Sequence, residues 1–292
     1  MSTPLPTPSS PPSDTTVDID QVEKDCVEKL KTLIKDDPEL PPAISELSDE
    51  FYLLLIRARR NRPEVSLKLI KSLIHFKTHQ YPDLFTDLEA FTIEPVMENE
   101  MIRVVKRGEG YTGPTVIVFR TTQWDTSLAD IDMLIKAGFL YALQMSTASN
   151  PTQERAGIVM ILDMAGFSFS HARECTYSSV LKVANCIIFG SPFRINSAFI
   201  TNSPYIFEKV FAVVKFAIPE FYRNFITVTT QDFTKLHSLV EPDLLPESLG
   251  GSVPEEEGWE EGVEDAIRDG GGGSQLVYEL MDAVERQEEN KE

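Results

Sequence analysis

The residue types of a hydrolytic triad stand close together after one apolar segment of the chain. Asp163 follows Val159–Leu162, and Ser170 and His171 come next as neighbours. A carboxylate, an imidazole and a hydroxyl can together activate a serine nucleophile. However, no G-x-S-x-G turn surrounds Ser170, and residues adjacent in sequence seldom face each other productively. We therefore expect no enzymatic activity here, and we interpret residues 168–172 (SFSHA) as a polar turn that satisfies backbone groups after a strand.

Metal and phosphate sites receive no better support from the sequence. The histidines lack the paired spacing of a zinc site; they are His75, His79, His171 and His237. The GEGYTG segment (residues 108–113) contains the glycines of a phosphate loop, yet it precedes a strand instead of opening a helix. We interpret it as a hairpin turn, and we expect neither a metal nor a cofactor.

The composition predicts a globular protein without a membrane span. The chain has 292 residues and 42% hydrophobic content, which is enough for a substantial core. Its longest apolar runs are far shorter than the roughly 18 to 20 residues that a spanning helix needs. The first 13 residues lack a basic start and an apolar stretch, so we expect no secretory signal and a cytoplasmic location. The three cysteines show no CxxC spacing and are expected to be reduced; they are Cys26, Cys175 and Cys186.

The net charge of -19 is distributed unevenly. Residues 254–292 hold 14 of the 46 acidic residues but only 3 of the 27 basic ones, so the body of the chain is less acidic than the total suggests. A local basic patch that touches a membrane surface therefore remains compatible with the sequence, whereas nothing resembles a nucleic-acid-binding stripe. We interpret the acidic, Gly-rich end as a solvated tail, in which Leu276, Leu280, Met281 and Val284 could form one last short helix. An arm that competes with anionic lipid is the alternative.

The N-terminal third predicts a small helical unit after a disordered leader. Residues 1–17 are rich in Pro, Ser and Thr and bury too little apolar surface to offset the entropy of ordering. Apolar residues then recur at helical spacing from about Asp18. A second helix should begin after Ser48, and a third at Pro63, a favoured residue in a first helical turn. We assign residues 18–90 to this N-terminal helical domain.

The pattern changes to alternating strands and helices after residue 90. The predicted strands are Ile102–Val105, Thr115–Arg120, Gly157–Asp163, Ala198–Thr201 and Phe225–Thr230. Helical patterns at Met133–Met145, Thr176–Phe189 and Ser203–Phe216 separate most of them. Strands and helices that alternate in this way predict an α/β fold with a mostly parallel sheet. We assign residues 91–253 to this domain and 254–292 to the C-terminal tail.

Several ordered motifs identify a family resemblance over roughly residues 25–251. They are LLIRARR (54–60), VIVFRTTQWD (116–125), DMLIKAGF (132–139), LDMAGFSFSHA (162–172), SPFRI (191–195), ITNSP (200–204) and LPESLGG (245–251). Together they resemble the CRAL-TRIO lipid-binding family, in particular its tocopherol-transfer and retinaldehyde-binding branch. The resemblance implies a small helical bundle packed on an α/β domain whose sheet floors a closed cavity for one lipid.

The resemblance implies a set of cavity-wall residues. These are Leu134, Ile135, Gly138, Phe139, Ala142, Ile158, Met160, Leu162, Cys175, Val183, Ile187 and Phe193. None is charged at neutral pH, which predicts a mostly uncharged ligand portion inside. Gly138 and Ala142 are small and would leave room for a ring or a chain. Without the resemblance, the same residues would be interpreted as the ordinary core of a doubly wound sheet.

The resemblance also implies a mobile lid at residues 202–225 and a phosphoinositide headgroup site beside it. The lid would present an apolar face of Phe207, Val210, Phe211 and Val214 at helical spacing, although a fixed core helix has the same pattern. The headgroup would be held by Arg57, Arg59, Arg194, Lys215 and Arg223. Phe221 and Phe225 stand where related proteins place basic residues, which removes two donors from this cluster.

The sequence therefore supports two hypotheses of different classes. The first is a cytoplasmic, non-enzymatic carrier that binds one hydrophobic small molecule or lipid, such as a tocopherol, a retinoid or a phospholipid, and exchanges it during transient contacts with membranes. The second is a phosphoinositide-dependent membrane or protein adaptor in which the cavity is vestigial. An esterase is a remote third hypothesis. Lipid retained by the purified protein would distinguish the first two.

Overall fold

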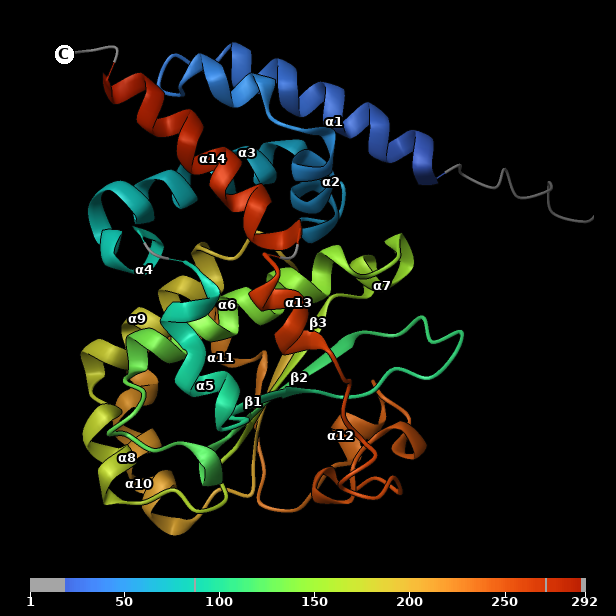
Figure 1. Cartoon of the computed structure of the whole chain (residues 1–292), viewed down its shortest axis with the longest axis vertical. Helices are drawn as coiled ribbons and strands as arrows, with labels where there is room; N and C mark the ends of the chain where they lie inside the picture. Colours follow the sequence, from blue (N-terminus) through green and yellow to red (C-terminus); the bar gives the residue numbers. More distant parts are fainter. Residues whose placement is uncertain (1–18, 87, 271, 290–292) are drawn as a thin grey trace, which may run out of the picture.

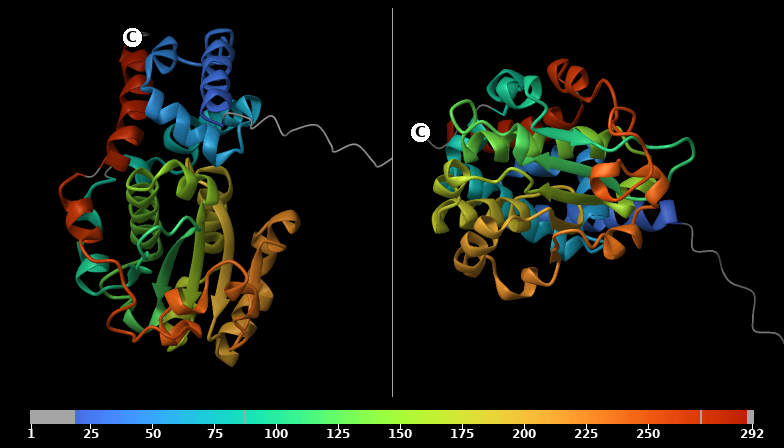
Figure 2. Two further views of the ribbon diagram at one scale, coloured as in Figure 1. Left: turned by 90° about the vertical axis from the view of Figure 1, so that its right-hand side faces the viewer. Right: turned by 90° about the horizontal axis from the view of Figure 1, so that it is seen from below.

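The computed structural model describes residues 19–86, 88–270 and 272–289 of the chain. A helical unit lies on one end of an α/β unit, as Figures 1 and 2 show. The helical unit contains α1 (Ile19–Lys35), α2 (Asp49–Ala58), α3 (Pro63–His75) and α4 (Pro82–Thr86). The predicted helix after Ser48 is confirmed, since the Ser48 hydroxyl accepts a hydrogen bond from the Phe51 amide at 3.3 Å.

The α/β unit is built on one sheet with the strand order β1-β2-β3-β4-β5. The strands are β1 (Ile102–Val104), β2 (Thr115–Arg120), β3 (Ile158–Asp163), β4 (Ile195–Thr201) and β5 (Ile226–Val228). Only the β1–β2 pair is antiparallel within this sheet, and the other three pairs are parallel. The predicted mostly parallel α/β fold is confirmed, and the GEGYTG segment lies in the β1–β2 hairpin as expected.

Helices cover one face of this sheet. The longest is α6 (Ile131–Thr147), which follows β2 after a short turn at Thr121–Gln123. The short helix α5 (Glu94–Glu98) precedes β1. The others on this side are α8 (Phe169–Glu174), α9 (Tyr177–Phe189), α10 (Tyr205–Val214) and α11 (Glu220–Arg223), and α7 (Pro151–Ala156) joins α6 to β3. The helix α6 begins where the Asp130 carboxylate accepts a hydrogen bond from the Met133 amide at 2.8 Å.

A largely irregular segment after β5 covers the opposite face. Its only α-helix among the described residues is α12 (Thr234–His237). Leu236, Val240, Leu245 and Leu249 from this segment form one buried cluster with Val159 and other strand residues. The LPESLGG motif closes the segment, and its last glycine lies against the Leu245 backbone, where a Cβ would come within 1.9 Å of the carbonyl oxygen. This close approach explains why glycine stands at position 251.

The interpretation of residues 254–292 as a solvated tail is wrong for most of this stretch. The Lys106 amide donates to the Gly258 carbonyl at 2.8 Å, so the segment pairs with the edge of β1, and Trp259 lies between Arg103 and Arg120. Two helices follow, α13 (Val263–Arg268) and α14 (Gly272–Glu289). Their buried residues join the main core: Val263, Ile267, Leu276, Val277, Leu280, Met281, Ala283 and Val284. The described acidic side chains of this stretch are exposed or half-buried, and two of them accept hydrogen bonds from the rest of the protein, Glu264 from Tyr141 and Glu279 from Ser48. The composition alone did not reveal this division.

The C-terminal helices also tie the two units together. The Tyr278 hydroxyl donates to the Leu88 carbonyl at 2.7 Å, and the Ser48 hydroxyl donates to Glu279 at 2.8 Å. Figure 1 shows α14 running alongside the N-terminal helices. The expected disordered leader, residues 1–17, lies outside the described residues.

Candidate functional site: a partly open layer between the helices and the sheet

The helix α6 presents one small-residue face toward the sheet. Leu134, Gly138 and Ala142 are spaced by four residues and share this face, and Ile135 and Phe139 flank it. Leu134, Ile135 and Gly138 are only half-buried although they lie between layers. A Cβ placed on Gly138 would meet no atom within 4 Å. Open space therefore lies beside the middle of α6.

The strand β3 lies opposite this helix and shows the same incomplete covering. Ile158, Met160 and Leu162 point to the helix side, since side chains alternate along a strand. Met160 and Leu162 are half-buried even though β3 is the central strand of the sheet. By contrast, Val159 and Ile161 on the other face are 0% and 1% exposed. The helix side of the sheet is thus less well filled than the opposite side.

The remaining predicted wall residues come from α9 and its neighbouring turns. Val183 and Ile187 lie one turn apart on α9, and both are half-buried. Cys175, in the turn before α9, is half-buried beside α8 and α10, and burial raises the pKa of its thiol to about 11. Phe193 is buried, and its ring meets that of Phe139 edge-on at 5.5 Å.

All twelve predicted wall residues therefore belong to the helix side of the sheet, but they differ in packing. Phe139, Ala142, Ile158 and Phe193 are buried near the helical unit, and the other eight are half-buried. Sequence reasoning missed further apolar residues on the same sheet face: Phe119, Ile195, Ala198 and Ile200. Alternation of side chains along β2 and the end of β4 could have found Phe119, Ala198 and Ile200, whereas the register shift after Ile195 hides that residue.

The predicted lid contains α10, a short turn at Lys215–Ala217, and α11. Phe207 and Val214 are buried, and Val210 and Phe211 are half-buried, so the predicted apolar face points inward. The Phe207 ring lies edge-on to Phe167 at 5.2 Å and stacks on Phe211 at 5.6 Å. The four residues named from the sequence thus form the inner face of this helix.

The start of the lid is held by a polar contact that sequence reasoning did not foresee. Asn202 has a positive φ of 49°, a conformation that asparagine tolerates better than most residues. Its side-chain amide donates to Asp163 at the end of β3, at 2.9 Å. Asp163 therefore orients the backbone where the lid begins.

This contact also separates Asp163 from the other residues of the hypothetical triad. The His171 Nδ1 atom accepts from the Ser168 amide at 3.0 Å, and its Nε2 atom lies 2.9 Å from the Trp124 carbonyl. The Ser170 hydroxyl is hydrogen-bonded to that of Ser168. These partners make His171 the anchor of a turn. Its ring also stacks on Trp124 at 4.9 Å.

Three of the five predicted basic residues, Arg59, Lys215 and Arg223, lie near one edge of the lid. Arg59 donates to the Ser191 carbonyl at 2.9 Å, which places it on the same turn as Arg194. Lys215 and Arg223 both lie over the ring of Phe216, at 5.5 and 5.4 Å from its centroid. Tyr222, next to Arg223, interacts electrostatically with Arg59. Arg194 points elsewhere: its guanidinium donates to the Arg155 carbonyl, and its side chain lines the same small pocket as Arg57 and Glu154.

Arg57 does not join this group. Its guanidinium is paired with Glu23 at 2.9 Å and with Glu154 at 2.5 Å, and all three side chains are largely buried. Burial raises the pKa of Glu154, an effect that the Arg57 charge opposes. Arg57 thus joins α1, α2 and α7, and its sequence neighbour Arg59 points to a different environment.

The four remaining cations are not neutralised by the protein. Among the residues that the structure describes, none of Arg59, Arg194, Lys215 and Arg223 forms an ion pair, whereas Arg57, Arg103, Arg107, Arg120, Arg155 and Arg268 all do. Burial lowers the pKa of Arg59 and of Arg194. Unpaired, partly desolvated guanidinium groups favour an anionic partner.

Neither a metal site nor a membrane span is found in the described part of the chain. No group of three His, Cys, Asp or Glu side chains is arranged to hold a metal ion there. Likewise, no helix within residues 19–86, 88–270 and 272–289 has the length and apolar character needed to cross a bilayer. All three cysteines are free thiols.

The fold is that of a known class of domain. A model of the CRAL/TRIO domain matches residues 99–251, just over half of the chain. The chain therefore belongs to the CRAL/TRIO domain family, and the resemblance deduced from its motifs is confirmed.

Individual relatives agree with this assignment. The alpha-tocopherol transfer protein-like protein of Mus musculus is 28% identical over 229 residues, which cover 78% of this chain and 65% of that protein. Clavesin-1 of Xenopus laevis is 22% identical over 230 residues, covering 78% and 68%. The crystal structure of Sfh5 aligns with a TM-score of 0.55 at 13% identity, over 91% of this chain and 98% of that one, and supports the fold alone. The chain thus matches slightly less than two thirds of the first of these relatives.

Proposed function

We propose that this protein is a non-enzymatic lipid carrier. It would hold one hydrophobic molecule, such as a tocopherol, a retinoid or a phospholipid, between the sheet and the helices α6, α9 and α10. The observation that carries this proposal is the open space beside Gly138 together with half-buried apolar side chains on the central strand. A well-packed domain would have filled this layer as it filled the opposite face.

Transfer energies explain why a lipid needs such a carrier. Exposure of apolar chain to water costs about 0.8 kcal/mol per CH₂, so a chain of roughly 18 carbons costs on the order of 14 kcal/mol. Spontaneous escape from a membrane is therefore slow. A protein layer lined by Leu134, Met160 and Val183 offers the lipid an apolar environment and lowers this barrier without making or breaking a bond.

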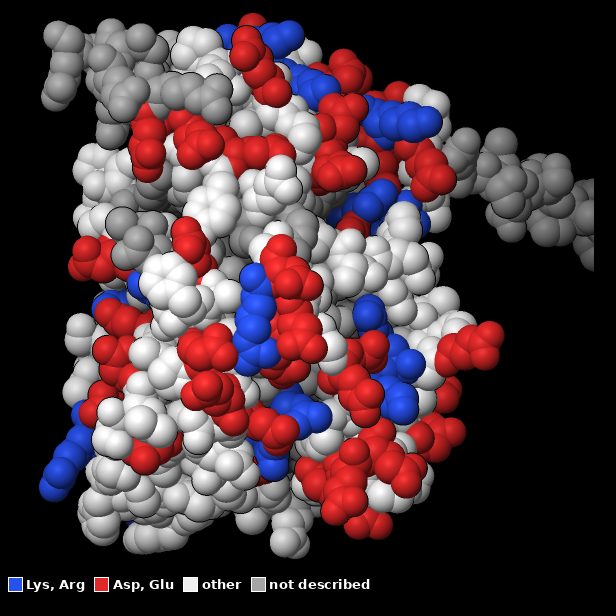
Figure 3. All heavy atoms as spheres, viewed as in Figure 1, with Lys and Arg blue, Asp and Glu red and all other residues white. Residues whose placement is uncertain are grey.

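The lid would open at a membrane surface. Apolar side chains on and beside it are exposed, including Phe169 (78%), Tyr205 (71%) and Val213 (69%). In Figure 3 the surface over α8 and α10 carries few charged side chains, whereas acidic residues gather over the segment around α12. This asymmetry supports an approach to anionic membranes with α8 and α10 facing the bilayer. The protein would be cytoplasmic and only transiently membrane-bound.

The basic group beside the lid supports a phosphoinositide headgroup as part of the membrane signal. Arg59, Lys215 and Arg223 would contact it, and Arg194 would join them after leaving the Arg155 carbonyl, whereas Arg57 would stay paired with its glutamates. In flotation assays, the double variant Arg59→Ala/Arg194→Ala should lose binding to phosphoinositide vesicles. Arg57→Ala should still float with these vesicles, because Arg57 does not contact the headgroup in this proposal. Unchanged flotation of the double variant would remove this part of the proposal.

The domain assignment follows the same reasoning. We propose that residues 18–90 support the lipid-binding domain of residues 91–253 and that residues 254–292, with α13 and α14, hold the two together. The contacts of Tyr278 with Leu88 and of Ser48 with Glu279 support this role.

The decisive experiment is native mass spectrometry followed by extraction and lipid identification. The purified protein should retain one lipid per chain. Gly138→Phe should abolish loading because its ring occupies the open space, while the fold survives. Gly138→Ala is the matched control: it adds one methyl group, should stabilise α6 by about 1 kcal/mol, and should still load.

An adaptor with a vestigial cavity is the second candidate function, and the unpaired arginines favour it. This adaptor would bind phosphoinositide membranes while remaining empty. A protein that stays empty after incubation with mixed-lipid vesicles, yet floats with phosphoinositide vesicles, would replace the carrier with the adaptor. Loading that persists in Gly138→Phe would instead show that the lipid lies elsewhere.

A further inference from the structure

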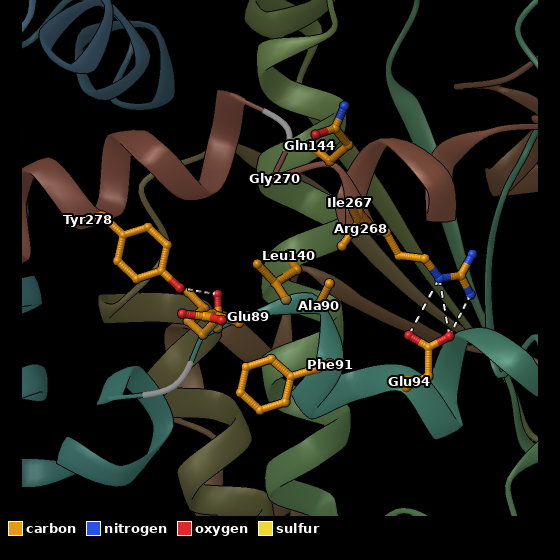
Figure 4. Close-up of a pocket in the computed structure, with 11 residues that line it drawn as sticks. Glu89, Ala90, Phe91, Glu94, Leu140, Gln144, Ile267, Arg268, Gly270 and Tyr278 are labelled. Carbon is orange, nitrogen blue, oxygen red and sulfur yellow. Dashed lines mark hydrogen bonds and ion pairs between the residues drawn. The ribbon is translucent and has the colours of Figure 1, made fainter.

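A cavity lies on the side of α6 that faces away from the proposed lipid layer. Its volume is about 400 Å³, and it is enclosed by the connection at residues 88–94, by α6 and by α13 and α14 (Figure 4). Leu140 and Gln144 contribute from α6, roughly on the opposite side of this helix from Gly138 and Ala142. The cavity is therefore separate from the lipid layer and has the size of a small-molecule site.

The floor of this cavity is apolar. Leu88, Leu140 and Ile267 line it and are each at most 6% exposed, so their side chains are fixed by the core beneath. The Tyr278 ring lines the wall, and its hydroxyl group is held by the Leu88 carbonyl at 2.7 Å. A ligand that entered would bury an apolar portion against a rigid surface.

The charged groups around the cavity leave an excess of negative charge. The Arg268 guanidinium donates to Glu94 at 2.8 and 3.1 Å and to Asp265 at 3.0 Å, so its charge is already matched by two carboxylates. Glu89 also lines the cavity, and within the described residues its carboxylate forms no ion pair. The cavity itself is therefore lined by two carboxylates, Glu89 and Glu94, and one guanidinium, which leaves one negative charge and favours a cationic ligand.

An exposed aromatic ring completes the site. Phe91 lies on the rim and is 67% exposed. In the view of Figure 4, Glu89 lies between Phe91 and Tyr278. Aromatic faces attract organic cations through their quadrupole, and recognition of quaternary ammonium groups by aromatic side chains is the best-known use of this attraction.

We propose that this cavity binds a small organic cation of the quaternary ammonium type. Its methyl groups would lie against Phe91, Tyr278 and the apolar floor, and its charge would be balanced by Glu89. The cation could be a free small molecule or the headgroup of a choline lipid, because both present the same trimethylammonium group. The proposal does not depend on the lipid-carrier function.

The test compares choline with 3,3-dimethylbutan-1-ol, which has nearly the same shape but no charge. Both are titrated by calorimetry into the full chain, and binding is located from amide chemical shifts of residues 88–94 and 263–270. Choline should bind saturably in the millimolar range, and the neutral analogue at least roughly threefold more weakly. Equal binding of the two compounds, or no saturable binding of choline, would overturn the proposal.

Three variants assign the site. Glu89→Gln removes the charge and keeps the shape, and Phe91→Leu removes the ring and keeps apolar area; each should weaken choline binding roughly two- to fivefold. Glu256→Gln removes an exposed acidic charge elsewhere and should change nothing. All three sites are exposed, so folding should be retained. Identical choline affinities in Glu89→Gln, Phe91→Leu and Glu256→Gln would contradict the assignment.

Titration with phosphatidylcholine vesicles then distinguishes the two sources of the cation. If the headgroup is the ligand, vesicles should shift the same amides and free choline should reverse the shift. If free choline binds but vesicles leave these amides unchanged, the ligand is a free cation. Both results support the site, whereas shifts confined to α8 and α10 with no effect of choline anywhere would refute it.

Discussion

The two faces of the central sheet are packed for different purposes. On one face, Val159 and Ile161 are covered by the irregular segment around α12 and are almost completely buried. On the other, Met160 and Leu162 remain half-buried beneath regular helices. An irregular segment can follow the sheet surface closely, whereas the straight helix α6 with Gly138 at its middle leaves space. The first face is closed, and the second leaves the space that we propose a lipid occupies.

Truncation on each face should reveal this difference most strongly. Ile161→Ala should lower the free energy of unfolding by about 3 to 4 kcal/mol, because it creates a cavity in a closed cluster. Met160 is the neighbouring residue on the same strand, and its side chain already faces open space. Met160→Ala should therefore lower the free energy of unfolding of the lipid-free protein by less than about 1.5 kcal/mol. Urea denaturation of both variants measures the two values. Equal losses would mean that the two faces are packed alike.

The C-terminal helix extends the closed packing to the helical unit. Leu280 on α14 is 1% exposed in the main core, so Leu280→Ala should cost about 2 to 3 kcal/mol. The expected loss of unfolding free energy for Leu280→Ala is smaller than for Ile161→Ala because a helix near the chain end can shift and fill part of the space that the missing side chain leaves. Asp282→Ala on the exposed side of the same helix is the control and should change stability by less than about 0.5 kcal/mol. If Leu280→Ala were as stable as this control, α14 would not be packed in the core and the interpretation of a solvated tail would be restored.

The regular elements were predictable because their signals are local. Alternating β-branched runs identified all five strands within a few residues, and Ser48 and Pro63 marked two helix starts correctly. The sequence indicated one short helix near the C-terminus, but this stretch was interpreted as a solvated tail because acidic residues dominate its composition. The apolar residues Leu276, Leu280 and Val284 follow a helical spacing that identifies the buried face, but their contact with the first helices is long-range.

The basic residues show where sequence reasoning ends. Arg57 and Arg59 stand two residues apart, and the motif gave them the same role. The structure separates them because Arg57 lies on the side of α2 that faces Glu23 and Glu154, while Arg59 caps the helix beside the Ser191 turn. Which arginine is neutralised depends on acidic residues distant in sequence, so only the three-dimensional arrangement can decide it.

The reactivity of two cysteines tests, with the smallest expected effect, whether the region beside the lid is more open than the buried core. Cys175 is half-buried by the lid with a pKa of about 11, and Cys186 is buried with a pKa of about 12. Because both pKa values are raised, the reactive thiolate is scarce at neutral pH, and alkylation of Cys175 should accelerate about tenfold per pH unit between pH 7 and 10. Bound lipid should slow the reaction of Cys175 severalfold, while Cys186 should stay slow with or without lipid. Peptide mapping after iodoacetamide treatment, with Cys175→Ser to assign the signal, measures both rates. If lipid protected the two thiols equally, or neither of them, the open layer would not extend to the turn before α9.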